Sequence, residues 1–539
     1  MYLYLGARTA ERRGKKTFFF ILCSISFVLA FGSKENAAML PVSLFLYEIL
    51  VIQENTYSFL RKNLKWILLF LGIILLSGLI YLSYTGGGIF SFRSGYRERS
   101  FSMMQRLLTE PRVILFYISL LVYPVANRLS IAHSISISTS LFHPVSTFLS
   151  ILLILGSVAY LAYGARKHPL ISFCFLFFFL NHLIESTIFP LELIYEHRNY
   201  IPSMLFFVPV AIGLIHLVEL YSTKTIIKYS ISVFIVLILI SFGHSTFVRN
   251  FIWKNGISLW IDASEKAPDQ FRVHHNLGLY YQDHGDNEKA ITEYEKALKS
   301  PFIYMKNAVV KTYCNLGNLY EGLKDYKKAK FYYKKALQIK PDLHLAFNGL
   351  ASIYYKEGEN DLADRYLHRA LKANPGDLRA NYNMGLYLLK NRMPGKAIRH
   401  LIAVISSKGL ENKTLLYLGI AYKQMGLNGR AVTYFREAKI MDPKNLTPHL
   451  HLAEIYYKTG NGRMAQKEMD AIVDLMVKDK ALFYQIVDLI LKKGNLGHIQ
   501  LSQKIIFPLL LETVSDKSKI LNKCEEYVKE VMGKEVRDK

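Results

Sequence analysis

The second half of the chain repeats itself every 34 residues, and this period constrains the fold more than any other feature of the sequence. Five units follow one another without a gap from Val310, and an earlier unit, longer by five residues, begins at Phe271. Position 8 is always Gly or Ala and position 20 is always Ala; in chain order these pairs are Gly278 and Ala290, Gly317 and Ala329, Ala351 and Ala363, Gly385 and Ala397, Gly419 and Ala431, and Ala453 and Ala465. Small residues at both positions allow two helices to pack closely. Proline at position 32 (Pro341, Pro375 and Pro443) interrupts the chain before the next unit.

A period of 34 residues with these small positions is that of the tetratricopeptide repeat (TPR), a helix-turn-helix unit that stacks into an α-solenoid. We therefore predict six such repeats over residues 271–475. Residues 476–539 are expected to form capping helices, because the ends of a solenoid need a cover.

The first half of the chain is apolar, and no Asp occurs before Asp262. Since Asp is among the costliest residues to place in hydrocarbon, this predicts a multi-pass transmembrane domain over residues 1–243. About seven segments have the length and composition of spans, namely 17–31, 37–52, 64–84, 145–163, 170–189, 205–221 and 226–242. Residues 244–270 are the predicted linker to the repeats, so the whole chain is expected to be all-α. A secretory signal is the alternative for the first segment, but no small-x-small cleavage site follows it.

Basic residues in short loops set the orientation, because such loops favour the cytoplasmic side. Residues 113–125 are short for a span and are expected to be re-entrant or interfacial. If they do not cross, four basic loops lie inside and the repeats lie on the extracytoplasmic side. If they cross, the repeats are cytoplasmic. We expect the first topology, because it places four basic loops on the cytoplasmic side with the single assumption that residues 113–125 do not cross.

The loop 85–112 contains five Arg and only two Glu, although this topology places it outside. Arg suits phosphate groups, since its planar fork binds two oxygens at once. The same face is expected to carry Lys34, Glu35 and the segment 196–200. We predict a lipid-linked phosphate as the ligand, and binding of anionic lipid headgroups is the alternative. Glu185, near a span end, is expected to pair with Arg198 or His182.

Positions 2 and 13 of each repeat lie close to three helical turns apart and therefore share a face. Most of them are basic: Arg272, Lys311, Arg379 and Lys413 at position 2, and Lys356, Lys390 and Lys458 at position 13. We predict a groove for acidic or carboxylate-bearing protein or peptide partners; a solvated Lys-rich face is the more common explanation of such a pattern. Nucleic acid is not expected as a partner. No metal site is expected either, because the four cysteines lie far apart.

Two tryptophans, Trp253 and Trp260, lie in the predicted linker. They either anchor it at the membrane interface or pack against the first repeat.

Three segments together resemble one family: Phe31-Gly32-Ser33-Lys34-Glu35, Arg106-Leu107-Leu108-Thr109 and Glu196-His197-Arg198-Asn199-Tyr200-Ile201-Pro202-Ser203. They resemble the transmembrane and tetratricopeptide-repeat O-mannosyltransferases and their bacterial relatives, which have a GT-C membrane domain followed by repeats outside the cytoplasm. The resemblance implies transfer of a sugar, mannose in that family, from a polyprenyl-phosphate carrier to a protein hydroxyl. It implies that Lys34, Arg106 and Arg198 face the carrier phosphate. Glu35, Glu196 and His197 then orient these cations or the sugar, and Tyr200 belongs to the same site.

Members of that family carry acidic catalytic residues in their first external loop, and further helices precede the Ser-Lys-Glu turn. No Asp is present here before Asp262, so no catalytic residue is assigned. We expect a truncated gene product, a missing part supplied by another chain, or a protein that does not catalyse. Three functions are therefore open: a GT-C glycosyltransferase, a non-catalytic membrane-anchored TPR scaffold, and a ligase or polymerase of surface glycans.

The orientation can be tested with alkaline phosphatase fused after Gly243 in a bacterial host. We expect the fusion to be active, because this enzyme folds only outside the cytoplasm. A fusion after Lys167, in a predicted inner loop, is the control and is expected to be inactive. An inactive Gly243 fusion beside an active Lys167 fusion would reverse the topology.

Overall fold

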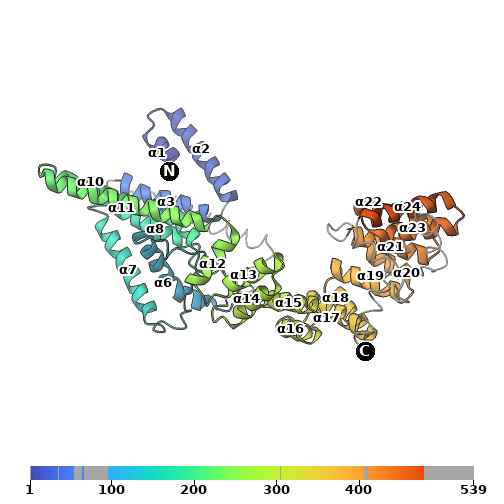
Figure 1. Cartoon of the computed structure of the whole chain (residues 1–539). Helices are drawn as coiled ribbons and strands as arrows, with labels where there is room; N and C mark the ends of the chain where they lie inside the picture. The colour runs from blue at the N-terminus through green and yellow to red at the C-terminus, as the bar shows by residue number, and fades with distance from the viewer. Residues whose placement is uncertain are drawn as a thin grey trace. The chain divides into compact units, whose positions relative to one another are not determined.

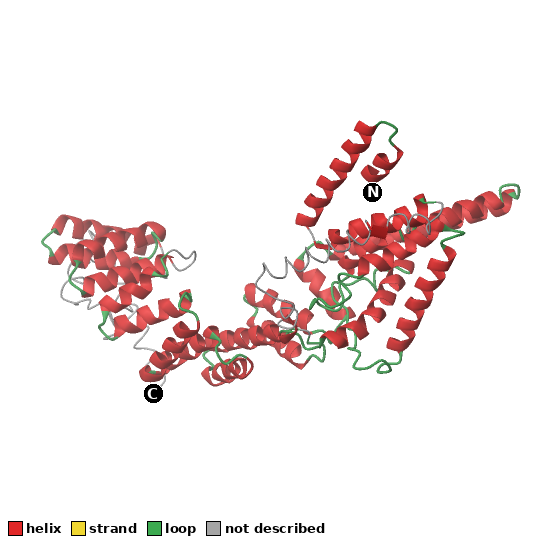
Figure 2. Ribbon diagram, turned by 180° about the vertical axis from the view of Figure 1, so that it is seen from behind, coloured by secondary structure: helices red, strands yellow, loops and turns green. Residues whose placement is uncertain are grey.

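The structure is a computed structural model of the 539-residue chain, and it describes residues 2–33, 35–53, 64–65, 95–303, 305–405 and 411–478. Within these ranges every regular element is a helix (Figures 1 and 2), which confirms the predicted all-α class. The chain divides into two compact units, Met1–Thr312 and Tyr313–Lys539, and each is described by itself.

The first unit contains the apolar helices together with the first helix pair of the repeats. Its elements are α1 (Tyr2–Thr9), α2 (Arg13–Ser33), η1 (Glu35–Met39), α3 (Leu40–Tyr47), η2 (Glu48–Ile52), α6 (Met103–Val122), α7 (Ser146–Gly164), α8 (Pro169–His182), η3 (Glu196–Asn199), α9 (Tyr200–Ser203), α10 (Val208–Leu220), α11 (Thr225–Ile252), α12 (Gly256–Lys266), α13 (Phe271–Asp283) and α14 (Asn287–Lys299).

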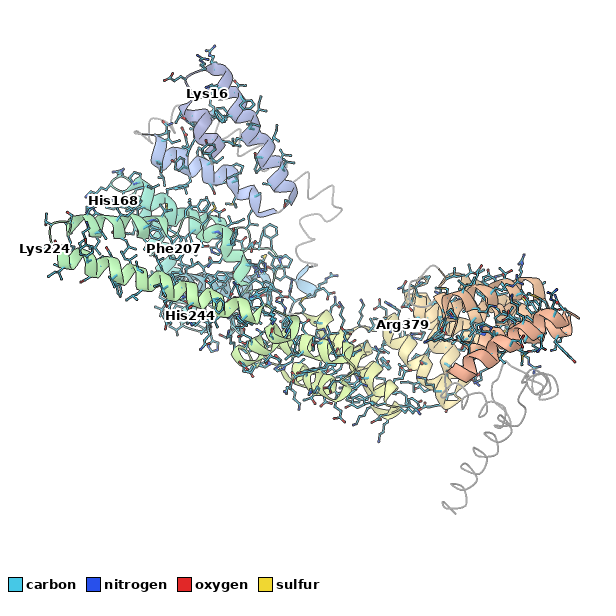
Figure 3. All side chains as sticks on the ribbon, turned by 45° about the horizontal axis from the view of Figure 1, so that its top comes forward. Lys16, His168, Phe207, Lys224, His244 and Arg379 are labelled. Carbon is cyan, nitrogen blue, oxygen red and sulfur yellow. The ribbon has the colours of Figure 1, made fainter. Side chains whose placement is uncertain are left out.

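Among the described residues, the helices α2, α7 and α11 are long and apolar enough to cross a membrane. A fourth candidate is the pair formed by Glu196–Ser203 and Val208–Leu220, which is bent by 57°. These four correspond to predicted spans. Lys224 lies at the turn between α10 and α11 (Figure 3), where a long cationic side chain can reach an interface.

Two other predicted spans, 37–52 and 170–189, coincide with shorter apolar helices, Ala37–Ile52 and Pro169–His182. The predicted span 64–84 lies outside the described residues except for residues 64 and 65. The number of spans, their orientation and the GT-C-like arrangement stay predictions.

The helix α6 differs from the expectation for residues 113–125. It begins with a capping box formed by Ser102 and Gln105, and it continues without a break to Val122. Its buried residues are Arg106, Thr109, Glu110, Val113, Tyr117 and Leu120, which follow one another at helical spacing. The helix is thus longer than the predicted stretch and packs a charged face inside the unit, while the placement of residues 113–125 relative to a membrane stays a prediction.

The predicted linker, residues 244–270, is largely helical. The boundary at residue 243 falls inside α11, which ends only at Ile252, and α12 follows directly. The Asn255 side chain caps α12 by accepting a hydrogen bond from the Ser258 N–H. Asp262 Oδ2 then pairs with Arg249 Nη1 of α11 at 2.7 Å, so the two helices are held together.

Six helix pairs follow the predicted register of the repeats. After α13 and α14 come α15 (Lys306–Gly322) with α16 (Tyr326–Ile339), α17 (His344–Glu357) with α18 (Asn360–Ala373), α19 (Leu378–Lys390) with α20 (Pro394–Ile402), α21 (Glu411–Gln424) with α22 (Asn428–Met441), and α23 (Leu446–Lys458) with α24 (Gly462–Lys478). The division between the two units falls inside α15, so the first repeat belongs to the first unit. The predicted capping helices, 476–539, lie almost wholly outside the described residues.

The small residue at position 8 faces a large buried side chain at position 24 of the same repeat. A Cβ added at Gly278 would lie 2.6 Å from the ring of Tyr294, and one added at Gly419 would lie 2.6 Å from the ring of Phe435. Both rings are fully buried. In these repeats position 8 is therefore Gly because the second helix inserts a ring against the backbone of the first; at Gly385 the buried Leu401 takes the place of the ring.

Residues 4 and 23 of a repeat form a second link between its helices, which the sequence analysis did not find. In three repeats this link is polar: His274 with Glu293 at 2.6 Å, Asn381 with His400 at 2.8 Å, and His449 with Glu468 at 2.7 Å. Each joins groups that the packing of the two helices shields from water, where an unpaired polar group is costly.

Replacing Gly419 by Ala is expected to destabilise the fifth repeat by about 1–3 kcal/mol, since the ring of Phe435 has no room to move. Gly429→Ala in α22 is the matched control, because nothing lies within 4 Å of its added Cβ. The control is expected to be neutral or to gain up to about 1 kcal/mol of helix propensity. Hydrogen-exchange protection of α21 and α22 in the full chain measures both effects. Equal protection in the two variants would contradict the packing role of position 8.

Candidate functional site

The polar groups of the first unit gather around the loop 183–195, which leads from α8 to η3, and Arg106 of α6 organises this loop. The Arg106 side chain is fully buried. Its guanidinium donates to four carbonyl groups of the loop, those of Thr187 (3.1 Å), Leu191 (2.6 Å), Glu192 (3.1 Å) and Glu185. Arg106 Nη2 also lies 2.7 Å from Glu110 Oε1, so the two form an ion pair. A guanidinium has five N–H groups, and Arg106 donates four hydrogen bonds to the loop, so it supports the loop instead of facing the site.

Arg198 also turns inward. Its Nε lies 3.0 Å from Glu185 Oε2, and its Nη1 donates to the Glu192 carbonyl. This confirms the expected pair between Glu185 and Arg198. The Arg198 side chain is only 9% exposed, so it too holds the loop in place.

Two predicted residues of this site are not located by the structure. Lys34 lies outside the described residues, and so does the side chain of Glu35, the first residue of η1. Their proposed contact with a phosphate stays a prediction.

The other predicted residues line one pocket of about 870 Å³. Its polar lining residues include Glu196, His197 and Tyr200, where η3 leads into α9. The lining also contains apolar side chains from α6, from α11 and from the residues that flank α10 and α11: Leu120, Leu121, Phe207, Phe242 and Trp253. Arg272, at the start of the first repeat, also lines the pocket. The pocket is therefore built by the apolar helices and the first repeat together.

Glu196 is held rigidly in the wall of this pocket. Its Oε1 accepts a hydrogen bond from the Ser130 N–H at 2.7 Å, and the same oxygen lies 2.7 Å from His133 Nε2. A carboxylate fixed in this way accepts hydrogen bonds from hydroxyl groups, and sugars are rich in hydroxyls. His133 was not expected from the sequence, because it lies 63 residues before Glu196 and in no recognised motif.

Tyr195 connects the supporting loop to the pocket. Its N–H donates to the Tyr117 hydroxyl at 2.8 Å, and that hydroxyl donates to the Tyr195 carbonyl at 2.8 Å. Burial and a hydrogen bond with the Glu192 carboxylate raise the pKa of Tyr195 to about 12. The Tyr195 phenol therefore stays protonated at neutral pH and acts as a hydrogen-bond donor.

The seven residues of the predicted groove are in three different situations. Arg272 packs against the rings of Tyr195 and Trp260. Lys356 Nζ lies 2.7 Å from Glu321 Oε1, Lys390 Nζ lies 4.3 Å from the centre of the Tyr355 ring, and Lys458 Nζ lies 2.7 Å from Glu454 Oε1. Lys311, Arg379 and Lys413 are exposed. Several of the lysines are thus engaged by neighbouring residues of the solenoid, and the groove for acidic partners stays a prediction.

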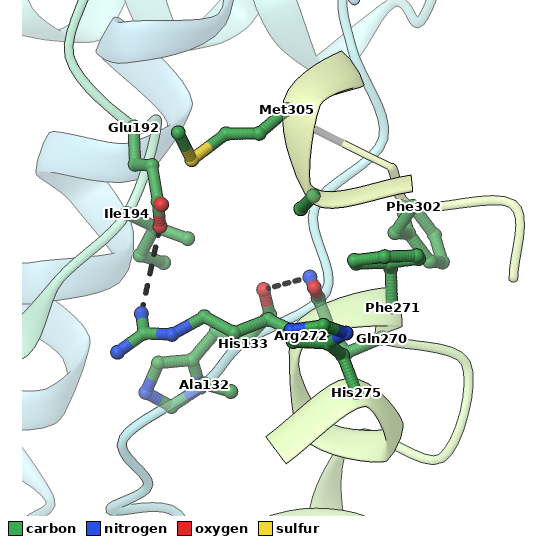
Figure 4. A pocket seen from close by; sticks show the side chains of 11 residues that line it. Ala132, His133, Glu192, Ile194, Gln270, Phe271, Arg272, His275, Phe302 and Met305 are labelled. Carbon is green, nitrogen blue, oxygen red and sulfur yellow. Dashed lines mark hydrogen bonds and ion pairs between the residues drawn. The ribbon is translucent and has the colours of Figure 1, made fainter. Parts of the chain in front are cut away.

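The first repeat is attached to the loops of the first unit by specific contacts. Gln270 Nε2 donates to the His133 carbonyl at 2.7 Å (Figure 4), and Lys266 Nζ donates to the carbonyls of Ala126 and Leu129 at 2.8 and 2.9 Å. The ring of Trp260 packs with Val273 and Leu277. Of the two roles considered for Trp260, the structure supports packing against the first repeat.

A smaller pocket of about 180 Å³ lies at this attachment (Figure 4). Glu192 and His133 line it from the loops, and Gln270, Arg272 and His275 line it from the first repeat. Arg272 lines both pockets, so a single side chain of the repeat reaches the two cavities.

Family models of the tetratricopeptide repeat match residues 271–301, 310–343 and 348–405. The chain therefore contains tetratricopeptide repeats, as predicted. Human protein O-mannosyl-transferase TMTC3 is 23% identical over 294 residues, which cover 52% of this chain and 32% of that protein. Type IV pilus assembly protein PilF of Pseudomonas aeruginosa is 26% identical over 148 residues, 27% of this chain and 59% of that protein. The chain spans about a third or less of the first curated relatives it matches.

Solved structures of repeat proteins are also similar. The structure of YrrB, a TPR protein with an unusual peptide-binding site, is 23% identical with a TM-score of 0.27, and covers 35% of this chain and 95% of YrrB. That of PilW, a type IV pilus biogenesis factor, is 21% identical with a TM-score of 0.35, and covers 40% of this chain and 98% of PilW.

Lowering the pH is expected to destabilise the first repeat through His275. Burial and the nearby Lys311 lower the pKa of His275 to about 4, so the ring is neutral in the folded protein at pH 5 but charged in the unfolded chain. Between pH 7 and pH 5 the unfolded state binds more protons, and the repeat should lose about 1–2 kcal/mol. Hydrogen-exchange protection of α13 in the full chain, corrected for the intrinsic rate, measures this loss.

His275→Gln should reduce that pH dependence, because the amide keeps polar contact without titrating. The exposed His284 at the end of the same helix provides the control variant, His284→Gln. If His275→Gln loses as much protection as the control on acidification, the titration of His275 is not the cause.

Proposed function

We propose that this chain is a membrane protein in which the larger pocket binds a lipid-linked sugar phosphate and the tetratricopeptide repeats bind a protein that accepts the sugar. The observation that carries this proposal is the mixed lining of the pocket. Glu196, His197 and Tyr200 are polar, and Phe242 and Trp253 are apolar. A ligand with a sugar head and an apolar chain matches both kinds of lining residue.

The position of the apolar lining residues supports a lipid ligand in particular. Phe242 and Thr246 belong to α11, a helix long and apolar enough to cross a membrane, and Trp253 follows its last residue. A polyprenyl chain lying along α11 would remain in hydrocarbon while its head group enters the pocket. The pocket volume, about 870 Å³, is in the range of sites for small molecules.

The similarity to protein O-mannosyl-transferase TMTC3 supports sugar transfer as the reaction, since the name of that relative describes transfer of mannose to protein. In such a transfer the acceptor oxygen bonds to the anomeric carbon as the bond from that carbon to the carrier phosphate breaks. The hydroxyl proton passes to a base, which is not assigned. In this proposal Lys34 faces the phosphate, and Arg106 and Arg198 position the loop that carries Glu196.

A non-catalytic, membrane-anchored scaffold is the second candidate. It is favoured by one observation: Arg106 and Arg198, which the family resemblance assigns to the phosphate, are engaged by groups of the chain itself. The similarity to PilF, a pilus assembly protein, fits a role in recruiting partners. In this alternative the repeats bind protein and the pocket does not turn over a substrate.

Glu196→Gln in the full chain, reconstituted in lipid nanodiscs, tests the proposal. We expect binding of polyprenyl-phosphate mannose to weaken about 10- to 100-fold, because an amide accepts a weaker hydrogen bond than a carboxylate. Glu265→Gln is the control, since Glu265 is exposed on α12 and lies outside the pocket. Transfer of labelled mannose to a Ser- and Thr-rich acceptor protein is measured in parallel.

Two results would oppose the proposal. Equal donor binding by wild type and Glu196→Gln would remove the pocket as the donor site. Donor binding that is absent from the wild type, together with stable capture of partner proteins by the repeats, would favour the scaffold.

A further inference from the structure

We propose that Arg272, the second residue of the first repeat, recognises the phosphate of the ligand, so that the repeat domain itself completes the binding site. This inference rests on the proposed function, because it concerns the same pocket. The phosphate is thus bound by Arg272, which the sequence pattern placed in the peptide groove, and not by Arg106 and Arg198.

Arg106 and Arg198 are bound by other groups of the chain, which leaves Arg272 as the arginine considered for the phosphate. Arg106 is fully buried, donates four hydrogen bonds to the loop and forms an ion pair with Glu110. Arg198 is 9% exposed and pairs with Glu185. Arg272 differs from both, because its side chain is 37% exposed and lines the pocket. Its nearest acidic contact is Glu192, whose Oε2 lies 3.5 Å from Arg272 Nη1.

Two aromatic rings fix the plane of the Arg272 guanidinium. Its central carbon lies 4.7 Å from the centre of the Tyr195 ring and 5.6 Å from that of Trp260. Rings that cover the faces of a guanidinium leave its N–H groups along the edge, which is the edge that binds two phosphate oxygens at once. The stacking also reduces the side-chain entropy that a ligand would otherwise have to remove.

His133 contacts both Glu196 and Gln270, and Gln270 lies two residues before Arg272. Gln270 Nε2 donates to the His133 carbonyl at 2.7 Å, and His133 Nε2 lies 2.7 Å from Glu196 Oε1. A cation and a carboxylate of one pocket are thereby held by a single loop residue. This arrangement suits a head group in which a phosphate and hydroxyls occur together.

Little free energy is lost when Arg272 breaks its contact with Glu192. Their 3.5 Å separation is long for an ion pair, and partly exposed pairs contribute little to stability. Glu192 also keeps its hydrogen bond with the Tyr195 phenol, so its carboxylate remains paired. Arg272 can therefore exchange Glu192 for a phosphate without leaving a buried charge alone.

The ligand chemistry follows from these contacts: a phosphate carried by an apolar chain, which fits Arg272 and the apolar residues of α11. The phosphate could also be free, and the experiment separates the two sources. The full chain in phosphatidylcholine nanodiscs is titrated with farnesyl phosphate, with farnesol, which lacks the phosphate, and with inorganic phosphate.

Arg272→Met keeps the length and apolar packing of the side chain but removes its charge. We expect it to weaken binding of farnesyl phosphate at least 10-fold and to leave binding of farnesol unchanged. Arg272→Lys keeps the charge without the planar fork and should fall between Met and wild type. Arg379→Met is the matched control, because Arg379 occupies the same position of the fourth repeat and is exposed; its binding should equal that of wild type. Weakened binding of inorganic phosphate by Arg272→Met would also support recognition of the phosphate, with free phosphate as its source.

The proposal is overturned if Arg272→Met binds farnesyl phosphate as wild type does, or if Arg272→Lys and Arg272→Met lose farnesol and farnesyl phosphate equally. In the first case, if the wild type still binds farnesyl phosphate better than farnesol, a lipid phosphate remains the proposed ligand and only the role of Arg272 is wrong. A wild type with no preference for farnesyl phosphate would instead overturn the lipid-phosphate ligand, and Arg272 with it.

Discussion

The buried guanidinium of Arg106 is the group on which the rest of the first unit depends. The loop 183–195 has little regular structure, so its carbonyl groups lack the partners that a helix would supply. Arg106 donates to four of them, and Glu110 on the same helix face balances its charge. Lys has three donors on a single nitrogen and could not reach all of these carbonyls. The pocket residues Tyr195, Glu196 and His197 follow directly after this loop, so their positions depend on Arg106.

The attachment of the first repeat is the second constraint. A solenoid repeat normally contacts only its neighbours, but α13 also contacts the loops of the apolar half through Gln270, Arg272 and the packing of Trp260. The first repeat therefore cannot be exchanged for any other repeat of the solenoid. It also gives the pocket a wall that belongs to the first repeat, so the repeat and the apolar helices are physically connected at the pocket.

The sequence predicted the repeats well because their pattern is local. Position 8 must be small wherever position 24 places a large side chain against it, as Gly419 and Phe435 show, and a small residue recurs at position 8 of each unit. The candidate site was predicted less completely. Glu196, His197 and Tyr200 do line one pocket, and Glu185 does pair with Arg198. The sequence did not predict that Arg106 is engaged by a loop of the chain itself or that Arg272 lines the pocket, since residue type does not show how many of an arginine's donors the fold already uses.

The sequence by itself therefore determined the all-α class, the register of the repeats and the apolar character of the first half, because periodicity and composition are properties of short segments. Only the tertiary structure decided which charged side chains support the chain and which face the pocket. His133 meets Glu196 across 63 residues, and Arg272 meets Glu192 across 80. Contacts between residues so far apart in the chain arise from the packing of helices and loops, and a local sequence pattern cannot predict them.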